Sequence, residues 1–224
     1  MLKVGFLLSA GGAAFDAAVR LSKLPPDLCH VVVDRDCGAM KKAQRLGIST
    51  TLCNAPDKED LSEAAHKAFR DAGCAFVVMQ FSRLVSSVLY DRILTVNLHP
   101  SHLPAFPGMN AVGAAHDAKM PTQGATLHCV DEGIDTGTII AQTISAIPNQ
   151  ASLDQRRALS YRQKVILTLA LIDWSCAGRI DPTRLNPTAF NFDGLVHTNM
   201  CSPGFHSRDT HAVAHGFLSS PPIF

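Results

Sequence analysis

Short apolar runs alternate with stretches of helical periodicity along the first hundred residues. Continuous apolar runs of this length are typical of strands that are buried on both faces of a parallel sheet. Strands that alternate with helices favour parallel βαβ units and an open sheet covered on both sides. We therefore expect strands at 2–8, 28–33, 48–52, 74–81 and 93–98, and helices at 13–24, 39–46 and 58–72.

The pattern changes after residue 99. Pro100, Pro104 and Pro107 indicate an extended loop, because proline cannot continue a strand or a helix interior. Further along, two apolar runs flank the polar segment 131–137, which is typical of a hairpin with a wide loop. We expect a helix at 111–119, strands at 123–130 and 138–147, and a long helix at 153–177. The predicted fold is α/β, an open, doubly wound, mostly parallel sheet with a Rossmann-type N-terminal half.

Residues 186–224 lack clear periodicity and are rich in Pro, Gly, Ser and His. We expect one catalytic domain over 1–185 and an irregular C-terminal tail over 186–224. His211 and His215 are four residues apart, as two metal ligands on one helical turn would be. No third ligand stands at a matching distance, so we expect no metal site.

Composition excludes several function classes. Apolar residues make up 46% of the 224 residues and charged residues 17%, with a formal net charge of +1. This balance offers no electrostatic surface for nucleic acid or for a membrane, and no segment reaches the roughly 20 apolar residues of a membrane span. The seven cysteines are odd in number, show no CxxC spacing and lie partly in apolar runs. Reduced thiols in a cytoplasmic protein explain them best.

The end of the strand at 93–98 carries the candidate chemistry. Asn97 and His99 are two residues apart, so their side chains point to the same face, and Pro100 ends the strand. An amide and an imidazole there can stabilise an oxyanion and move a proton. Asp135, flanked by glycines, is the carboxylate that would support the imidazole. An ordinary strand-end histidine and a solvated turn aspartate remain the alternative on this information alone.

Four linked segments decide between these interpretations. They are N-L-H-P-S-H-L-P from residue 97, the following F-P-G, then G-A-T-L-H-C-V from residue 124, and D-T-G-T-I-I-A-Q from residue 135. In this order and spacing they resemble the folate-dependent formyltransferase family, and its glycinamide ribonucleotide formyltransferases in particular. Weaker similarity extends from residue 2 to about residue 179.

The resemblance implies a reaction. It implies direct transfer of a formyl group from 10-formyltetrahydrofolate to an amine through a tetrahedral intermediate, with catalytic roles for Asn97, His99 and Asp135. It also implies a pterin pocket between the loop after the fourth strand and the loop before Asp135. The implied donor-binding residues are Arg83, Leu84, Val85, Val130, Asp131, Glu132 and Gly133, and the supporting residues are Ser101, Gly108 and His128.

The acceptor half of the family pattern is altered. Glycinamide ribonucleotide enzymes have S-G-x-G-S-N in the first loop, where side chains and amides hold the substrate phosphate. This chain has Ser9 followed by A-G-G-A-A, so Gly11 and Gly12 offer backbone amides without the two side-chain donors. Losing several charge-assisted bonds would cost several kcal/mol. We therefore expect another small amine, such as an amino sugar, a hydroxylamine or an amino-acid-like compound.

Other functions remain open at this stage. The chain could be a glycinamide ribonucleotide formyltransferase despite its altered loop, or a formyltetrahydrofolate hydrolase that uses water as acceptor. A nicotinamide-dependent oxidoreductase is disfavoured because G-x-G-x-x-G is absent, and a catalytically silent binding protein would not need Asn97, His99 and Asp135. Monomer and homodimer are both compatible with the sequence.

Overall fold

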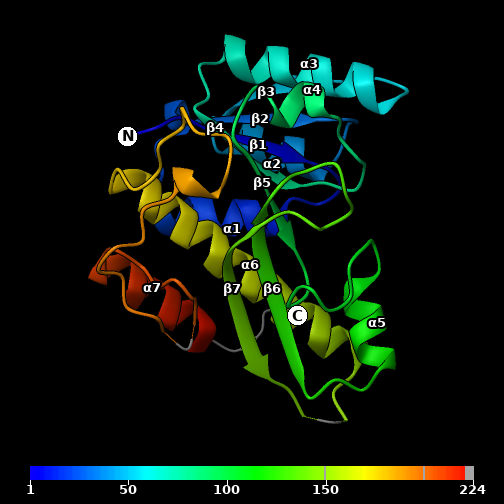
Figure 1. The fold of residues 1–224 in the computed structure, drawn as a ribbon, viewed down its shortest axis with the longest axis vertical. Helices are drawn as coiled ribbons and strands as arrows, with labels where there is room; N and C mark the ends of the chain where they lie inside the picture. Colours follow the sequence, from blue (N-terminus) through cyan, green and yellow to red (C-terminus); the bar gives the residue numbers. More distant parts are fainter. Residues whose placement is uncertain (149, 199, 220–224) are drawn as a thin grey trace.

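Seven strands form one sheet in the order β3-β2-β1-β4-β5-β6-β7 (Figure 1). The computed structural model describes residues 1–148, 150–198 and 200–219. β1 to β5 are parallel, and β6 and β7 are antiparallel to their neighbours. The strands are β1 (Val4–Leu8), β2 (Cys29–Val33), β3 (Ser49–Leu52), β4 (Phe76–Gln80), β5 (Thr95–His99), β6 (Thr122–Cys129) and β7 (Ile139–Ala146).

The expected α/β fold is confirmed, with a parallel half and an antiparallel hairpin in one sheet. Every expected strand and helix up to residue 177 is present, and the short helix α4 is an addition that the sequence did not indicate. The helices are α1 (Ala13–Ser22), α2 (Gly38–Arg45), α3 (Lys58–Asp71), α4 (Ser87–Tyr90), α5 (Ala111–Asp117), α6 (Leu153–Cys176) and α7 (Arg208–Ser219), with short 3-10 turns at Pro26–Leu28 and Pro187–Ala189.

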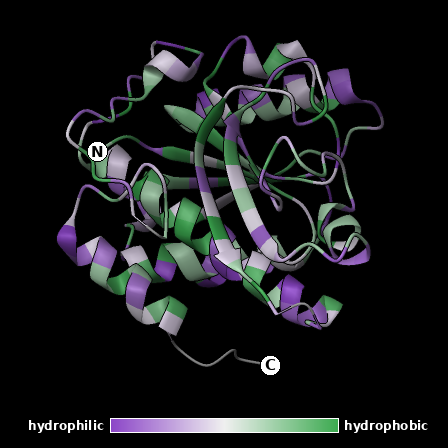
Figure 2. Cartoon of the chain, turned by 60° about the horizontal axis from the view of Figure 1, so that its bottom comes forward, coloured by the Kyte–Doolittle hydropathy of each residue, from purple (hydrophilic) through white to green (hydrophobic). Residues whose placement is uncertain are grey.

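Helices cover both faces of the parallel strands. Alternate strand residues such as Phe6 and Leu8 pack against α1, α2 and α6, while Leu7 and Val77 pack against α3 and α4 on the other face. Figure 2 shows apolar segments in the central strands and hydrophilic ones on the outer helices. The central strands β1 and β4 are apolar over nearly their whole length because both of their faces are buried.

The C-terminal end of β5 breaks this apolar rule. Met79 of β4 is aligned with Asn97 of β5, so Asn97 and His99 continue the face that packs against α3 and α4. After His99 the chain leaves the sheet in a loop that runs to α5. Two polar side chains therefore emerge at the carboxyl edge of the parallel strands, where open α/β sheets bind ligands.

The expectation of an irregular tail over 186–224 is wrong for residues 208–219, and residues 199 and 220–224 of that range lie outside the described residues. Residues 208–219 form α7, and the segment before it packs into the main core through Cys201 and Phe205. Trp174 of α6 is fully buried and donates a hydrogen bond from Nε1 to the carbonyl of Gly204 at 2.9 Å. This packing could not be predicted from the sequence. The segment contacts the core through backbone hydrogen bonds and single aromatic side chains, and such contacts produce no periodic pattern of apolar residues. The division of the chain at residue 185 stays a prediction.

Candidate active site

Four polar side chains meet where β5, β6 and the β6–β7 loop converge. Nδ1 of His99 lies 3.0 Å from Oδ2 of Asp135, and Nδ2 of Asn97 donates to Oδ1 of Asp135 at 3.2 Å. Nε2 of His128 lies 3.2 Å from Nδ2 of Asn97 and 3.5 Å from Oδ1 of Asp135. The predicted amide, imidazole and carboxylate are therefore brought together, and His128 adds a second imidazole to the cluster.

Asp135 points inward because the loop at 131–137 is tightly turned. Its backbone has a φ of +56°, in the left-handed region that few residues adopt without a structural cause. A Cβ at Gly137 would overlap the carbonyl oxygen of Cys129, so only glycine fits there. Within the loop, Oδ1 of Asp131 accepts a hydrogen bond from the hydroxyl of Thr136 at 2.8 Å. Local turn geometry thus aims one carboxylate at the sheet.

Both ring nitrogens of His99 face acceptors. Nδ1 faces the carboxylate of Asp135, and Nε2 lies 2.8 Å from the carbonyl oxygen of Phe106. A neutral imidazole has one N–H, so only the doubly protonated ring donates to both partners at once. His128 differs from His99. Its Nδ1 lies 2.8 Å from the carbonyl of Cys129 and is therefore fixed as a donor. Its Nε2 can accept a hydrogen bond from Asn97 or, when protonated, donate one to Asp135.

The Asp135 carboxyl is held ionised. Burial of its side chain, which is 12% exposed, acts to raise its pKa. Hydrogen bonds from His128 and His99, and one from the backbone N–H of Gly108 at 2.8 Å, outweigh that effect and hold the pKa well below the ordinary value. A carboxylate with so little proton affinity is a weak base and a strong partner for a neighbouring cation.

The loop between β5 and α5 wraps over this cluster. The hydroxyl of Ser101 donates to the carbonyl of Ala105 at 2.6 Å, which tightens the turn. Gly108 has a φ of +88°, a conformation that favours glycine, and its N–H reaches Asp135. Ser101 and Gly108, expected as supporting residues, therefore shape the loop that supplies two of the partners of the cluster.

Two further residues hold this loop and were not singled out from the sequence. Oγ1 of Thr126, fully buried on β6, donates to the carbonyl of Ser101 at 2.7 Å and accepts from the N–H of Leu103 at 3.0 Å. Nε2 of Gln142 on β7 donates to the carbonyl of Leu103 at 2.8 Å. Both residues belong to the sequence segments that carry the family resemblance, and membership of those segments is the feature by which the sequence could have identified them.

The two loops expected to bind the donor lie against one apolar cluster. Val85 follows β4 and Val130 follows β6, and both pack on the cluster that contains Leu89 of α4. Leu84 and Ile134 on the same two loops are 57% and 56% exposed. Exposed large apolar side chains on neighbouring loops are typical of a surface that receives a flat apolar ligand.

The acidic residues of the second loop also lie close to α4. Burial raises the pKa of Tyr90, and the charges of Asp91, Glu132 and Asp131 raise it further. Oδ1 of Asp131 accepts from the N–H of Gly133 at 3.1 Å, so Asp131 organises its own loop. The structure therefore brings residues 82–90 together with residues 130–134.

Arg83 has a structural task that its sequence position did not reveal. Its guanidinium donates to the carbonyl of Ala55 at 2.9 Å and to that of Pro56 at 3.0 Å, and it lies 3.9 Å from the buried carboxylate of Asp34. These bonds tie the loop after β4 to the loop before α3. A contact between Arg83 and folate stays a prediction.

The first loop, with Gly11 and Gly12, sits at the N-terminus of α1. The N–H of Ala39 donates to the carbonyl of Ala10 at 2.9 Å, and Nζ of Lys42 donates to the carbonyl of Gly11 at 2.7 Å. A Cβ at Gly12 would lie 2.6 Å from the Cβ of Ala39. The loop is thus clamped against α2, and its contact with an acceptor stays a prediction.

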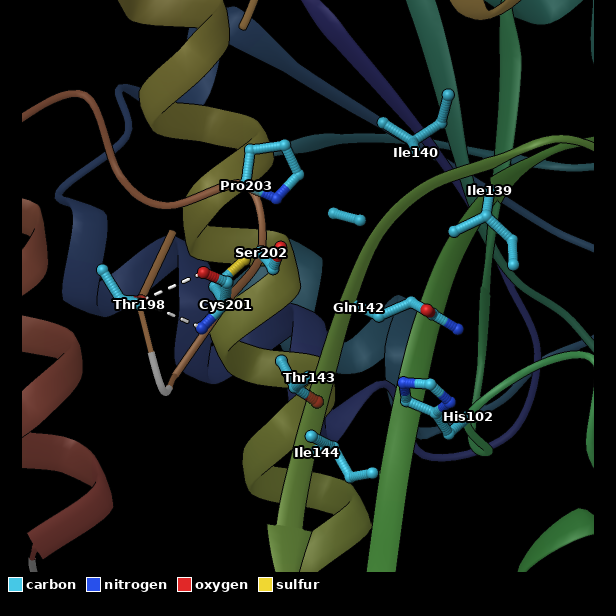
Figure 3. A pocket seen from close by; sticks show the side chains of 11 residues that line it. His102, Ile139, Ile140, Gln142, Thr143, Ile144, Thr198, Cys201, Ser202 and Pro203 are labelled. Atoms are coloured by element: carbon cyan, nitrogen blue, oxygen red, sulfur yellow. Dashed lines mark hydrogen bonds between the residues drawn. The ribbon is translucent and has the colours of Figure 1, made fainter. Parts of the chain in front are cut away.

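A separate cavity of about 620 Å³ opens beside the edge strand β7 (Figure 3). Gln142 and Ser202 pair there through two backbone hydrogen bonds of 2.9 and 3.0 Å. His102 lies across from these residues, on the loop that covers the cluster of Asn97 and Asp135. The cavity is lined by His102, residues 139–144, Thr198 and residues 201–203. None of the expected catalytic residues is among them.

Two properties of the described part of the chain bear on metals and membranes. Within residues 1–148, 150–198 and 200–219, no group of three or more His, Cys, Asp or Glu is placed to hold a metal ion. No helix in the same ranges is long and apolar enough to cross a membrane.

Comparison with known proteins matches this geometry to a family. Residues 2–167 match the model of the formyl transferase family. A phosphoribosylglycinamide formyltransferase of Mycobacterium tuberculosis is 30% identical over 167 residues, which cover 70% of this chain and 76% of that protein. A Bacillus subtilis protein of the same name is 52% identical over 59 residues, which cover 26% of this chain and 30% of the relative.

Solved structures of similar proteins have the same fold as this chain. The glycinamide ribonucleotide transformylase 1 of Geobacillus kaustophilus is 26% identical, with a TM-score of 0.69 over 77% of this chain and 99% of that one. The phosphoribosylglycinamide formyltransferase of Coxiella burnetii shares the fold, with a TM-score of 0.73 at 21% identity over 91% of this chain and 98% of the other.

An amide, an imidazole and an ionised carboxylate at the carboxyl edge of an α/β sheet form an arrangement that can stabilise an oxyanion. With the matches above, this chain belongs to the formyl transferase family, whose members take the formyl group from 10-formyltetrahydrofolate.

Proposed function

We propose that the chain transfers the formyl group of 10-formyltetrahydrofolate to the amine of a small molecule. The observation that carries this proposal is the cluster in which Asp135 contacts both Asn97 and His99, within 3.2 and 3.0 Å. A structural scaffold has no use for a buried carboxylate at a strained backbone position with two potential oxyanion donors beside it.

The reaction is a direct displacement. The acceptor amine attacks the formyl carbon, the carbonyl oxygen becomes an oxyanion, and the bond from carbon to N10 of the folate then breaks. The amine loses one proton and N10 gains one, so the overall step consumes no other reactant. The folate leaves as tetrahydrofolate and the acceptor becomes a formamide.

Asn97 is the oxyanion donor in this proposal. Its Nδ2 carries two N–H groups, directed at Asp135 and at Nε2 of His128. The contact with His128, at 3.2 Å, is the one that the formyl oxygen can replace, because the hydrogen bond to the ionised Asp135 is charge-assisted and stronger. Asp135 then keeps the amide oriented while the other N–H turns to the substrate.

His99 and Asp135 act as a charge pair. Nδ1 of His99 faces the carboxylate of Asp135 and its Nε2 faces the carbonyl of Phe106, and a ring that donates from both nitrogens best stabilises a nearby negative charge. Because the pKa of Asp135 is held so low, we assign it the role of electrostatic partner and assign the proton transfer from amine to N10 to water.

The donor binds between residues 82–90 and 130–134 in this proposal. The exposed side chains of Leu84 and Ile134 supply apolar surface, and backbone groups of the two loops supply donors and acceptors for the pterin edge. Val85, Val130, Asp131, Glu132 and Gly133 belong to the same two loops, and Arg83 fixes the first of them.

The acceptor differs from glycinamide ribonucleotide in this proposal. The first loop lacks the serine and asparagine donors, because Ala13 and Ala14 follow Gly12. Its remaining amides near Gly11 and Gly12 can contact an acceptor but cannot replace the lost side-chain bonds. Glycinamide ribonucleotide itself remains the alternative acceptor, since the relatives described above carry that activity in their names.

The test is a transfer reaction followed by mass spectrometry. The protein is incubated with 10-formyltetrahydrofolate and a panel of amines that includes glycinamide ribonucleotide, nucleotide amino sugars and N-hydroxyornithine. We expect one amine to gain the mass of a formyl group, and Asn97→Ala to abolish most of that gain. If no amine on the panel or in a metabolite extract is formylated, the proposal is wrong.

Water is the second candidate acceptor. The chain is 30% identical over 139 residues to formyltetrahydrofolate deformylase 2 of Arabidopsis thaliana, covering 58% of this chain and 42% of that protein. Release of tetrahydrofolate and formate at an unchanged rate with and without amine would favour this reaction. Release that depends on the amine would favour transfer.

We further propose a cytoplasmic location, with no nucleic acid or membrane as a partner. All seven cysteines are free thiols, and burial raises the pKa of Cys29 and Cys201 to about 12. Such thiols are inert packing residues, as expected in a reducing compartment. Fractionation of cells that express the protein would test the location, and its mass in solution would decide between monomer and homodimer.

A further inference from the structure

A line of polar residues runs along α6 on the side that faces the parallel strands. Ser160, Lys164 and Thr168 are spaced four apart, so they lie on one face of the helix. Ser160 and Thr168 are buried and Lys164 is partly buried, whereas the flanking residues of this helix, such as Val165 and Leu167, are apolar and buried. A polar line on a buried helix face indicates something polar opposite it.

The position of Lys164 follows from its neighbours. The hydroxyl of Thr168 lies 3.4 Å from Nε2 of Gln80, the last residue of β4. α6 runs opposite to β4, because its C-terminal Cys176 lies beside Met1, which precedes the sheet. Four residues of helix span about 6 Å. Lys164 therefore lies roughly one turn beyond the carboxyl end of β4.

This end of β4 adjoins the candidate active site. β4 pairs with β5, and Met79, next to Gln80, is aligned with Asn97. Gln80 faces α6 while Asn97 faces the donor loops, so the two side chains lie on opposite sides of one sheet edge. Lys164 is thus on the side of that edge away from the folate loops. The first loop, with Gly11 and Gly12, starts at the end of the adjacent strand β1.

Lys164 has nothing to pair with inside the described part of the protein. Its side chain forms no hydrogen bond or ion pair with the residues that the structure describes, and its ammonium is not among the fully buried atoms. Burial lowers the pKa of Lys164, with no neighbouring carboxylate to offset the effect. An ammonium that is partly shielded from water and has no protein partner is available to an anionic ligand.

We infer that Lys164 binds an anionic group of the acceptor, and that this group is a carboxylate, so that the acceptor is a small amino acid or a compound like it. This inference rests on the proposed transfer to an amine. The acceptor would cross the edge between β4 and β5, with its carboxylate at Lys164 and its amine at the cluster around Asn97.

A carboxylate fits better than a phosphate. A phosphate monoester carries a charge near −2 and is held by several charge-assisted donors. Here the line on α6 offers one ammonium, because the hydroxyl of Ser160 is fully buried and that of Thr168 already donates to the carbonyl of Lys164 at 2.8 Å. The first loop has lost its side-chain donors at Ala13 and Ala14. One cation matches a single negative charge.

A labelling experiment tests the anion site without any turnover. An amine-reactive acylating reagent is applied to the protein in sodium acetate, in sodium chloride and in inorganic phosphate at equal ionic strength, and acylation of each lysine is followed by mass spectrometry. We expect acetate to slow the acylation of Lys164 but not that of Lys41, an exposed lysine of α2. Equal rates in acetate and chloride overturn the inference, and protection by phosphate alone overturns the carboxylate assignment.

A transfer experiment tests the specificity. Amino acids are compared with their amides as acceptors, so that only the carboxylate differs within each pair, using wild type, Lys164→Met, Lys164→Arg and the control Lys41→Met. We expect the acids to be preferred, and Lys164→Met to lower kcat/KM for acids roughly 10- to 100-fold, as for one lost charge-assisted hydrogen bond, with the amides unaffected. Lys164→Arg should restore part of the loss.

The two levels of proposal fail differently. If tetrahydrofolate does not bind to wild type and no acceptor is formylated, the proposed transfer is wrong. If transfer occurs but acids and amides react equally, or Lys164→Met behaves as Lys41→Met does, only the role of Lys164 is wrong. Unfolding in urea checks the variants, and Lys164→Met should be at least as stable as wild type because it removes a buried unpaired charge.

Discussion

Replacing Asp135 by asparagine removes one charge from the candidate site and changes little else. The side-chain amide oxygen of the new asparagine can still accept from the N–H of Gly108 and from His99, so the loop keeps most of its hydrogen bonds. What is lost is the negative charge beside the His99 ring. Asp135→Asn thus separates the electrostatic role from the structural one.

The expected size of the effect follows from the contacts of Asp135. Hydrogen bonds to a charged group contribute about 1.5–3 kcal/mol, and Asp135 lies 3.0 Å from His99 and 3.2 Å from Asn97. A loss of about 2–4 kcal/mol of transition-state stabilisation corresponds to roughly 30- to 1000-fold in rate, at about 1.4 kcal/mol per factor of ten. Donor affinity should change far less, because the folate loops do not depend on this charge.

The assay is single-turnover formyl transfer at saturating 10-formyltetrahydrofolate, with tetrahydrofolate binding measured separately by calorimetry. Asp27→Asn, at an exposed carboxylate outside the site, is the matched control and should react as wild type does. If Asp135→Asn transfers formyl within about threefold of wild type while remaining folded, the charge pair of His99 and Asp135 has no catalytic role.

Four further outcomes follow from the contacts of the site and of the C-terminal segment. Asn97→Ala should lower kcat by about 10²- to 10³-fold with little change in donor affinity, measured by stopped-flow absorbance; a change confined to KM would contradict an oxyanion role. In urea unfolding, the free energies of wild type and Asp135→Asn should differ by a constant amount above about pH 4 and converge below it. The reason is that the folded pKa of Asp135 lies below its unfolded value near 3.9, so its contribution to stability is lost as the pH falls through that window. A difference that grows in acid would refute this. Gly137→Ala should disable transfer while tetrahydrofolate still binds, since its Cβ displaces the carbonyl of Cys129 and with it the loop that aims Asp135; wild-type activity in this variant would show that the loop tolerates the displacement. Trp174→Phe should lower the free energy of unfolding by about 1–3 kcal/mol, because the buried carbonyl of Gly204 loses its donor, and an unchanged urea midpoint would show that the C-terminal segment is not anchored there.

Truncation of the C-terminal segment is a less selective experiment than its sequence suggests. Phe205, Cys201 and Ala214 are part of the main core, and Asp173 accepts hydrogen bonds from the backbone N–H groups of His206 and Ser207. Removing residues 186–224 therefore exposes the side of α6 and should unfold the protein. Single substitutions on this segment give a clearer result.

The sequence by itself indicated the strands and helices up to residue 177 and, through the family resemblance, the candidate residues Asn97, His99 and Asp135. The order of the strands in the sheet came from the tertiary structure. Local signals carry part of this information. Apolar runs such as the first four residues of β4 indicate a strand that is buried on both faces. The two-residue spacing of Asn97 and His99 indicates that their side chains lie on the same face of a strand. The glycines around Asp135 report a turn that aims it inward, as Gly137 shows.

Only the tertiary structure showed which polar side chains already form hydrogen bonds or ion pairs within the protein. Arg83 looks like a free cation in sequence, yet three carbonyls of the loop at 55–57 hold it. Lys164 looks like an ordinary helical lysine, yet it lies partly buried beyond the end of β4, with no partner among the described residues. The C-terminal segment looked irregular, yet it packs around Trp174. Pairing and burial depend on residues distant in the chain, and a sequence carries no local pattern for such contacts.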